Sequence, residues 1–251
     1  MLASLLLLFL LQAADPPQAV KDFQDWLSGQ PQADLFEQRV RYREHLKSKG
    51  LSDAQIGSLF RQLEADRWNR FFSNPPETFN PQPNAFMVEM VKGHQLGRAL
   101  EIGMGQGRNS VYLAKQGWNV TGFDIGDVGM RIAREAAAQA GVKITTVNAA
   151  MEDFDYGMNQ WDLIVATYEG ASWREKAVRA LKPGGIVIVE GFLRAPGTPP
   201  GASFGPNELL KFFTDLNLRI LHYEDADGKP DFGRGPGRVV RLCAQKSGTA
   251  Q

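Results

Sequence analysis

The chain has 251 residues, 43% of them hydrophobic and 22% charged, and its 28 Lys and Arg side chains balance 28 Asp and Glu side chains. This composition excludes a wholly disordered protein, because it supplies enough apolar surface for a core. The zero net charge argues against a protein that coats nucleic acid. With one cysteine, Cys243, and three histidines far apart in the sequence, we expect no internal disulfide and no metal site of the Cys/His type.

Residues 2–11 read LASLLLLFLL, an apolar run that only Ser4 interrupts. A transmembrane helix needs about 20 such residues, so no stable membrane span is expected here. The run has the length of a signal-peptide core, and Gln12-Ala13-Ala14 offers small residues for cleavage. We therefore expect a signal-like leader over residues 1–14 and an exported protein, periplasmic or secreted. The alternative is an apolar helix packed on the domain, in a cytoplasmic protein.

Residues 15–83 are predicted to form a helical extension followed by a linker. Helices are expected after Pro16-Pro17, over residues 33–48, and after the capping box Ser52–Gln55. Four prolines between residues 74 and 83 indicate the linker, and Asn84 can cap the next helix. We expect the extension to cover the acceptor pocket of the following domain, with an apolar wall from Trp68, Phe71 and Phe72. Packing on outer helices for stability alone is the other interpretation.

From residue 98 onward the pattern changes to short apolar strands alternating with helical stretches. This pattern is typical of a parallel sheet with helices on both faces, an α/β fold. Residues 218–223 and 239–244 have no helix between them, which favours an antiparallel hairpin at the sheet edge. The domain is predicted to span residues 84–246, with a tail over 247–251. Strands are expected at residues 99–102, 119–123, 143–147, 161–166 and 185–190.

A glycine-rich turn follows the first of these strands, in the sequence Glu101-Ile102-Gly103-Met104-Gly105-Gln106-Gly107. Glycines there allow the backbone to approach a ligand closely, and amides at the start of the next helix can hold an anionic group. Asp124 ends the second strand, where a carboxylate can accept both ribose hydroxyls. An acidic residue about 20 positions after a glycine loop indicates a nucleoside-binding crevice.

The segments EIGMGQGRNS, FDIG, WDLIVATYE and LKPGGIVIVE occur in this order and resemble the class I S-adenosylmethionine-dependent methyltransferase family. The stretch GQGRNSVYLAKQGWNVTGFD further resembles its tellurite-resistance-methyltransferase-like, small-molecule branch. The resemblance implies a Rossmann-like, seven-stranded, mostly parallel sheet with an antiparallel last strand. It implies S-adenosylmethionine as the cofactor, with contacts at Glu101, Gly103, Gly105 and Asp124. Further contacts are expected at Met104, Gly107, Asn109, Ile125, Met151, Glu152 and Thr167.

Tyr168 and Glu169 follow the fourth strand and are the candidate catalytic residues, expected to face the sulfonium and the acceptor. The predicted function is in-line methyl transfer to a small-molecule acceptor, with no nucleic-acid partner; the oligomeric state is left open. One alternative is a nicotinamide-dependent oxidoreductase, although G-x-G-x-G differs from the dinucleotide fingerprint G-x-G-x-x-G. The other is a non-enzymatic nucleoside-binding protein.

Overall fold

The computed structural model describes residues 17–75, 80–195, 203–228, 230–231 and 237–248. The chain divides into two compact units, residues 1–66 and residues 67–251. The leader predicted over residues 1–14 lies outside the described residues, so export stays a prediction. Within the described ranges, no helix is both long enough and apolar enough to cross a membrane.

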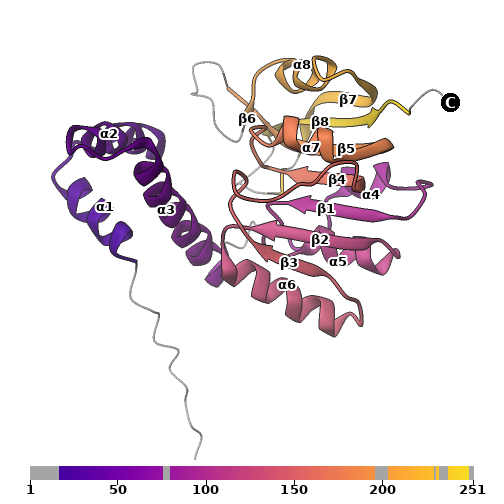
Figure 1. The fold of residues 1–251 in the computed structure, drawn as a ribbon, viewed down its shortest axis with the longest axis horizontal. Helices are drawn as coiled ribbons and strands as arrows, with labels where there is room; N and C mark the ends of the chain where they lie inside the picture. The colour runs from indigo at the N-terminus through magenta and orange to yellow at the C-terminus, as the bar shows by residue number, and fades with distance from the viewer. Residues whose placement is uncertain (1–16, 76–79, 196–202, 229, 232–236, 249–251) are drawn as a thin grey trace, which may run out of the picture. The chain divides into compact units, whose positions relative to one another are not determined.

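The first unit consists of helices α1 (Gln18–Ser28), α2 (Leu35–Ser48) and most of α3 (Asp53–Ser73), which continues into the second unit (Figure 1). The predicted capping box is confirmed, because the Ser52 amide donates to Gln55 Oε1 (2.9 Å) and the Gln55 amide donates to Ser52 Oγ (3.3 Å). Helix α2 begins two residues later than predicted, since the Asp34 side chain caps it. The small core of this unit contains Val20, Tyr42, Leu46, Ile56 and Leu63.

The second unit is built on one sheet in the order β3-β2-β1-β4-β5-β8-β7, with the two-residue strand β6 added beside β5 (Figure 1). Strand β8 is antiparallel to both of its neighbours, while the other long pairings are parallel. This confirms the Rossmann-like sheet and its antiparallel last strand. The strands are β1 (Arg98–Ile102), β2 (Asn119–Asp124), β3 (Thr145–Asn148), β4 (Trp161–Thr167), β5 (Leu181–Leu193), β6 (Ser203–Phe204), β7 (Leu218–Gly228) and β8 (Gly237–Lys246).

Several strand bounds differ from the prediction for reasons of pairing. The closing hairpin is longer than expected, because β7 and β8 pair as far as Gly228 and Gly237. Strand β5 extends to Leu193, since its last residues pair with both β8 and β6. Strand β3 begins at Thr145 rather than Lys143, because its neighbour in the sheet, β2, pairs with it from that residue onward. Pairing across the sheet, which is not visible locally in sequence, sets these ends.

Helices cover both faces of the sheet. Along β1, Ala99 belongs to one apolar cluster and Leu100 to another, as the alternation of side chains across a strand requires. One cluster includes residues of α4 (Ala85–Met90) and α5 (Arg108–Lys115). The other includes residues of α7 (Arg174–Ala180) and α8 (Glu208–Thr214). Asn84 caps α4 as predicted, accepting from the amide of Met87 (2.9 Å).

Candidate functional site

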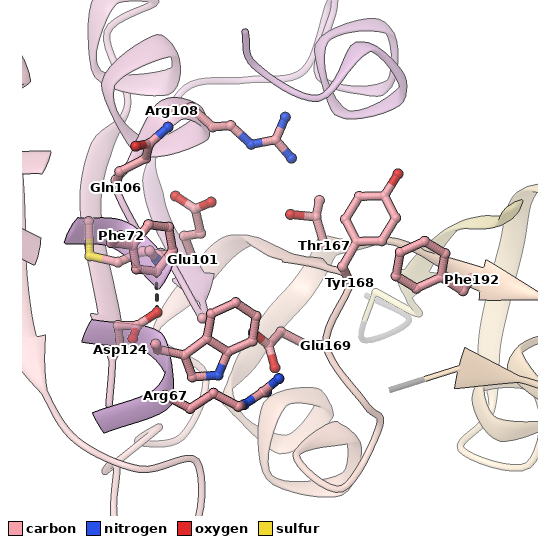
Figure 2. A pocket seen from close by; sticks show the side chains of 14 residues that line it. Arg67, Phe72, Glu101, Gln106, Arg108, Asp124, Thr167, Tyr168, Glu169 and Phe192 are labelled. Atoms are coloured by element: carbon pink, nitrogen blue, oxygen red, sulfur yellow. Dashed lines mark hydrogen bonds between the residues drawn. The ribbon is translucent and has the colours of Figure 1, made fainter. Parts of the chain in front are cut away.

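A cavity of about 250 Å³ lies where β1, β2 and β4 end, at Ile102, Asp124 and Thr167. Its walls combine the glycine loop with residues from β4, β5 and the end of α3 (Figure 2). The carboxyl ends of parallel strands are where open α/β sheets bind ligands. The lining residues are Arg67, Trp68, Phe72, Glu101, Gly103, Met104, Gly105, Gln106, Arg108, Asp124, Thr167, Tyr168, Glu169 and Phe192.

The three loop glycines, Gly103, Gly105 and Gly107, all have left-handed backbone angles, with φ of 63°, 49° and 72°. A Cβ at Gly103 would overlap the Glu169 carboxylate. A Cβ at Gly105 would lie 2.5 Å from Phe72 Cζ, and one at Gly107 would lie 2.6 Å from the Ala133 side chain. The turn therefore requires glycine both for its backbone angles and for the groups packed against it.

Asp124 joins the end of β2 to this loop. Its Oδ2 accepts from the amide of Gly105 and its Oδ1 from the amide of Gly126, each at 2.8 Å. Burial raises the pKa of the Asp124 carboxyl, while the two amides oppose that rise. Helix α6 (Asp127–Gln139) has Gly126 as its N-cap residue, so Asp124 is not its side-chain cap. The carboxylate borders the cavity and keeps lone pairs for further donors.

Glu101 is buried at the end of β1, with 2% of its surface exposed. One carboxylate oxygen accepts from Asn109 Nδ2 (2.9 Å) and the other from the Ser110 hydroxyl. Burial raises the pKa of Glu101 to about 7, although these bonds and Arg108 favour the charged form. The carboxylate therefore ties helix α5 to the sheet directly behind the glycine loop, as well as bordering the cavity.

Asn109 supports the site from beneath and does not line the cavity. Its amide nitrogen donates to Glu101 Oε1 (2.9 Å) and to the Thr167 hydroxyl (3.3 Å), and its Oδ1 accepts from the amide of Asn84 (2.8 Å). These bonds use the donors of the side chain and its oxygen, so in this structure Asn109 supports Glu101 and Thr167, and a direct cofactor contact at Asn109 stays a prediction.

Four other predicted cofactor residues also lie outside the cavity lining. Gly107 begins α5, where it packs against Ala133 instead. At the expected adenine edge, Asn148 donates to the backbone oxygens of Asp124 (3.2 Å) and Ile125 (3.0 Å). Contacts of the cofactor with these four residues stay predictions. They are Gly107, Ile125, Met151 and Glu152.

Tyr168 follows β4 with a left-handed backbone, at φ of 62°. Its hydroxyl donates to Glu190 Oε1 (2.5 Å) and accepts from the amide of Asp231 (2.9 Å). Burial and then the nearby charges of Glu190 and Asp231 raise the pKa of Tyr168. A phenol held in this way is unsuited to accept a proton from a substrate, which argues against Tyr168 as a catalytic base. Of the two candidates, Glu169 is the one whose carboxylate adjoins the glycine loop.

Beneath Tyr168 is a buried polar network that the sequence analysis missed. The Asn84 amide nitrogen donates to Glu190 Oε1 (2.7 Å) and to Asp231 Oδ2 (3.0 Å). Arg241 pairs with Glu190 (2.5 Å), and Arg108 pairs with Asp231 (2.5 Å). The sequence contains one signal of this network, Glu190 at the end of the apolar run GIVIVE. A carboxylate that ends a buried strand requires hydrogen-bond or charged partners.

Residues 99–185 match the family described as "Methyltransferase domain". An enzyme named ubiquinone biosynthesis O-methyltransferase from Shewanella pealeana is 28% identical over 144 residues, which cover 54% of this chain and 61% of that protein. A Vibrio campbellii enzyme of the same name is 33% identical over 79 residues, which cover 32% and 34%. In the matches to these two relatives, the chain thus spans from 34% to 61% of the relative's length.

Solved structures share the fold. The crystal structure of TehB from Haemophilus influenzae aligns with a TM-score of 0.56 at 21% identity, covering 72% of this chain and 67% of that one. At this identity the likeness shows a shared fold. An S-adenosylmethionine-dependent methyltransferase from Methanosarcina mazei aligns with a TM-score of 0.53 at 20% identity, covering 66% of this chain and 99% of that one. Residues 99–185 therefore match a methyltransferase domain, and the second unit has the Rossmann-like fold of these solved methyltransferase structures.

Proposed function

We propose that the chain transfers the methyl group of S-adenosylmethionine to a small-molecule acceptor bound in the cavity at the ends of β1, β2 and β4. The observation that carries this proposal is the meeting of the glycine loop, Asp124 and the β4 end around one cavity. The names of the partial relatives, which are O-methyltransferases, support a small organic acceptor. The methyltransferase match gives no support to the nicotinamide alternative.

The donor set around the cavity fits this cofactor. Three carboxylates line it, those of Glu101, Asp124 and Glu169, together with the guanidinium groups of Arg67 and Arg108. A ligand that carries a sulfonium, an ammonium and a carboxylate suits such a mixed lining, because opposite charges attract strongly in a partly desolvated cavity. Asp124 has the position and the lone pairs for ribose hydroxyls, beside a loop whose glycines allow close approach.

S-adenosylmethionine, when bound, supplies a methyl group on a positively charged sulfur. The chain's own residues would then bind and orient the reactants, since positioning can account for much of the barrier lowering when the donor is already activated. The aromatic rings of Tyr168 and Phe192 would form an apolar wall for the acceptor and exclude water. Glu169, whose carboxylate lies against Gly103 and lines the cavity, would accept a proton from an acceptor that must lose one.

Titration of the full chain with S-adenosylmethionine, S-adenosylhomocysteine and NAD⁺ by calorimetry tests the proposal. We expect saturable binding of the first two ligands and none of NAD⁺. Binding of NAD⁺ alone would favour the oxidoreductase alternative. A screen of small phenols, amines and thiols with methyl-labelled cofactor then tests transfer, and cofactor binding with no transfer to any of them would favour the nucleoside-binding alternative.

A further inference from the structure

A hydrogen bond joins the end of helix α3 to the first turn of α6, which lies about 60 residues further along the chain. Asn69 Oδ1 accepts from the amide of Val128 at 3.1 Å. Val128 is the second residue of α6, whose N-cap residue, Gly126, has no side chain to satisfy the exposed amides. Asn69 thus performs the capping role that Ser, Thr, Asp or Asn usually performs within the helix itself. Both groups belong to the second compact unit.

Phe72, one turn further along α3, lies directly on the backbone of the glycine loop. Its ring reaches to within 2.5 Å of where a Cβ on Gly105 would stand, and to within 2.9 Å of one on Gly129. Only 6% of Phe72 is exposed. The ring of Trp68 stacks beside it, with centroids 5.9 Å apart. Two glycines, one in the loop and one in α6, therefore provide the seat for this aromatic side chain.

Trp68 and Phe72 also line the cavity, together with Gly105 and Asp124. Figure 2 shows Phe72 and Asp124 at its wall. The cavity, at about 250 Å³, is slightly smaller than the roughly 300–1,000 Å³ that ligand pockets usually have. With Phe72 seated, a ligand across Gly105 and Asp124 would be enclosed on the side of α3.

We propose that residues 67–73 at the end of α3 are part of the cofactor site, with Trp68 and Phe72 closing the cavity over the bound cofactor and Asn69 anchoring them to α6. The inference rests on the proposed function, because it takes the ligand at Gly105 and Asp124 to be the cofactor. Its consequence is kinetic: the aromatic pair retains the cofactor, so loosening the pair speeds dissociation more than association.

The test measures binding of S-adenosylhomocysteine to the full chain by stopped-flow, with Trp68 fluorescence as the signal and Trp68→Phe to identify it. We expect Phe72→Ala to raise the dissociation rate about tenfold and to weaken affinity similarly, since an enclosing aromatic contact is lost. Phe36→Ala is the control, because Phe36 is 48% exposed in helix α2 of the first unit and does not line the cavity. Its loss should change the rate less than about twofold.

Variants of Asn69 test the same proposal independently. Asn69→Ala should raise the dissociation rate about fivefold because the cap is lost, and Asn69→Asp, which keeps an accepting oxygen, should restore it. Amide hydrogen exchange should show residues 67–73 becoming more protected when S-adenosylhomocysteine binds. If Phe72→Ala does not fold, Phe72→Leu keeps the apolar packing and removes the ring.

Two failures are distinguishable. A wild-type chain that binds neither S-adenosylmethionine nor S-adenosylhomocysteine would overturn the proposed function itself. A wild-type chain that binds while the Phe72 and Asn69 variants bind equally well, or more tightly, would overturn only the role of the α3 end. Tighter binding would show that Phe72 obstructs the cofactor instead of retaining it.

Discussion

On one side of the cavity, the glycine loop, Glu101 and Asp124 come from a single short stretch of chain, residues 101–124. On the other side, Phe192 packs on Tyr168 (Figure 2). The Tyr168 hydroxyl is held by Glu190 and by the backbone amide of Asp231, which are far apart in the sequence. The first side consists of backbone amides and carboxylates around a turn. The second consists of aromatic rings supported by a buried network of charges.

This difference indicates a division of roles between the two sides. A turn between a strand and a helix can bind part of a ligand through its own backbone amides, without contributions from distant elements. An aromatic wall on a buried network depends on several elements at once, and its partners are desolvated together. We therefore expect changes on the loop side to alter cofactor binding, and changes in the network to alter folding stability first.

The largest expected effect is on the network side, in Glu190→Ala. This change leaves Arg241, Asn84 and the Tyr168 hydroxyl without their shared acceptor and should lower the free energy of unfolding by about 3–5 kcal/mol. Chemical denaturation measures it. Glu224→Ala is the matched control, because Glu224 pairs with the same Arg241 but is 35% exposed, against 3% for Glu190. Equal losses in the two variants would contradict a buried network.

The second prediction concerns pH and Glu101. Because burial raises the pKa of Glu101 from 4.5 to about 7, the folded state binds more protons than the unfolded state between these values. The stabilisation is fully present below about pH 4.5 and is lost as pH rises through about 7, by roughly 3 kcal/mol at most. Denaturation of wild type and Glu101→Gln at several pH values measures it. The two stability profiles should diverge over this window, and parallel profiles would refute the assignment.

Asp124→Asn is the direct test of the loop side. Removing the charge should weaken the binding of S-adenosylhomocysteine about tenfold or more, since hydrogen bonds to a charged group contribute about 1.5–3 kcal/mol each. Asp127→Asn, at an exposed acidic residue in the first turn of α6, is the control and should bind normally. Calorimetry that shows unchanged affinity in a folded Asp124 variant would remove Asp124 from the cofactor site.

The smallest expected effect sharpens the comparison. Tyr168→Phe removes one donor from Glu190, which keeps Asn84 and Arg241, and it leaves the amide of Asp231 without its acceptor. Stability should therefore fall by about 1–2 kcal/mol, less than in Glu190→Ala. Affinity for S-adenosylhomocysteine should stay within about twofold of wild type, because the phenol hydroxyl points into the network. A marked loss of cofactor affinity in this variant would show that the two sides are not separable.

The amino-acid sequence by itself determined the sheet, its closing hairpin and the loop side of the cavity. Apolar strands alternating with helices permit few topologies. Gly103, Gly105 and Asp124 form a local motif, a glycine-rich turn followed by an acidic strand end, that can be identified without knowing the rest of the fold. The capping residues Ser52 and Asn84 were also predictable, since a cap acts within one turn of chain.

Only the tertiary structure decided which distant side chains meet at the site. Asn69 caps a helix 59 residues away, and Phe72 packs on Gly105, contacts that no local pattern encodes. Asn109 faces inward to Glu101 and Thr167 because β1 and β4 are neighbours in the sheet, not in sequence. Long-range packing and the pairing of buried polar groups are properties of the assembled fold. The sequence therefore predicted an aromatic wall from Trp68, Phe71 and Phe72, but not that Phe72 packs on Gly105 or that Phe71 lies outside the cavity lining.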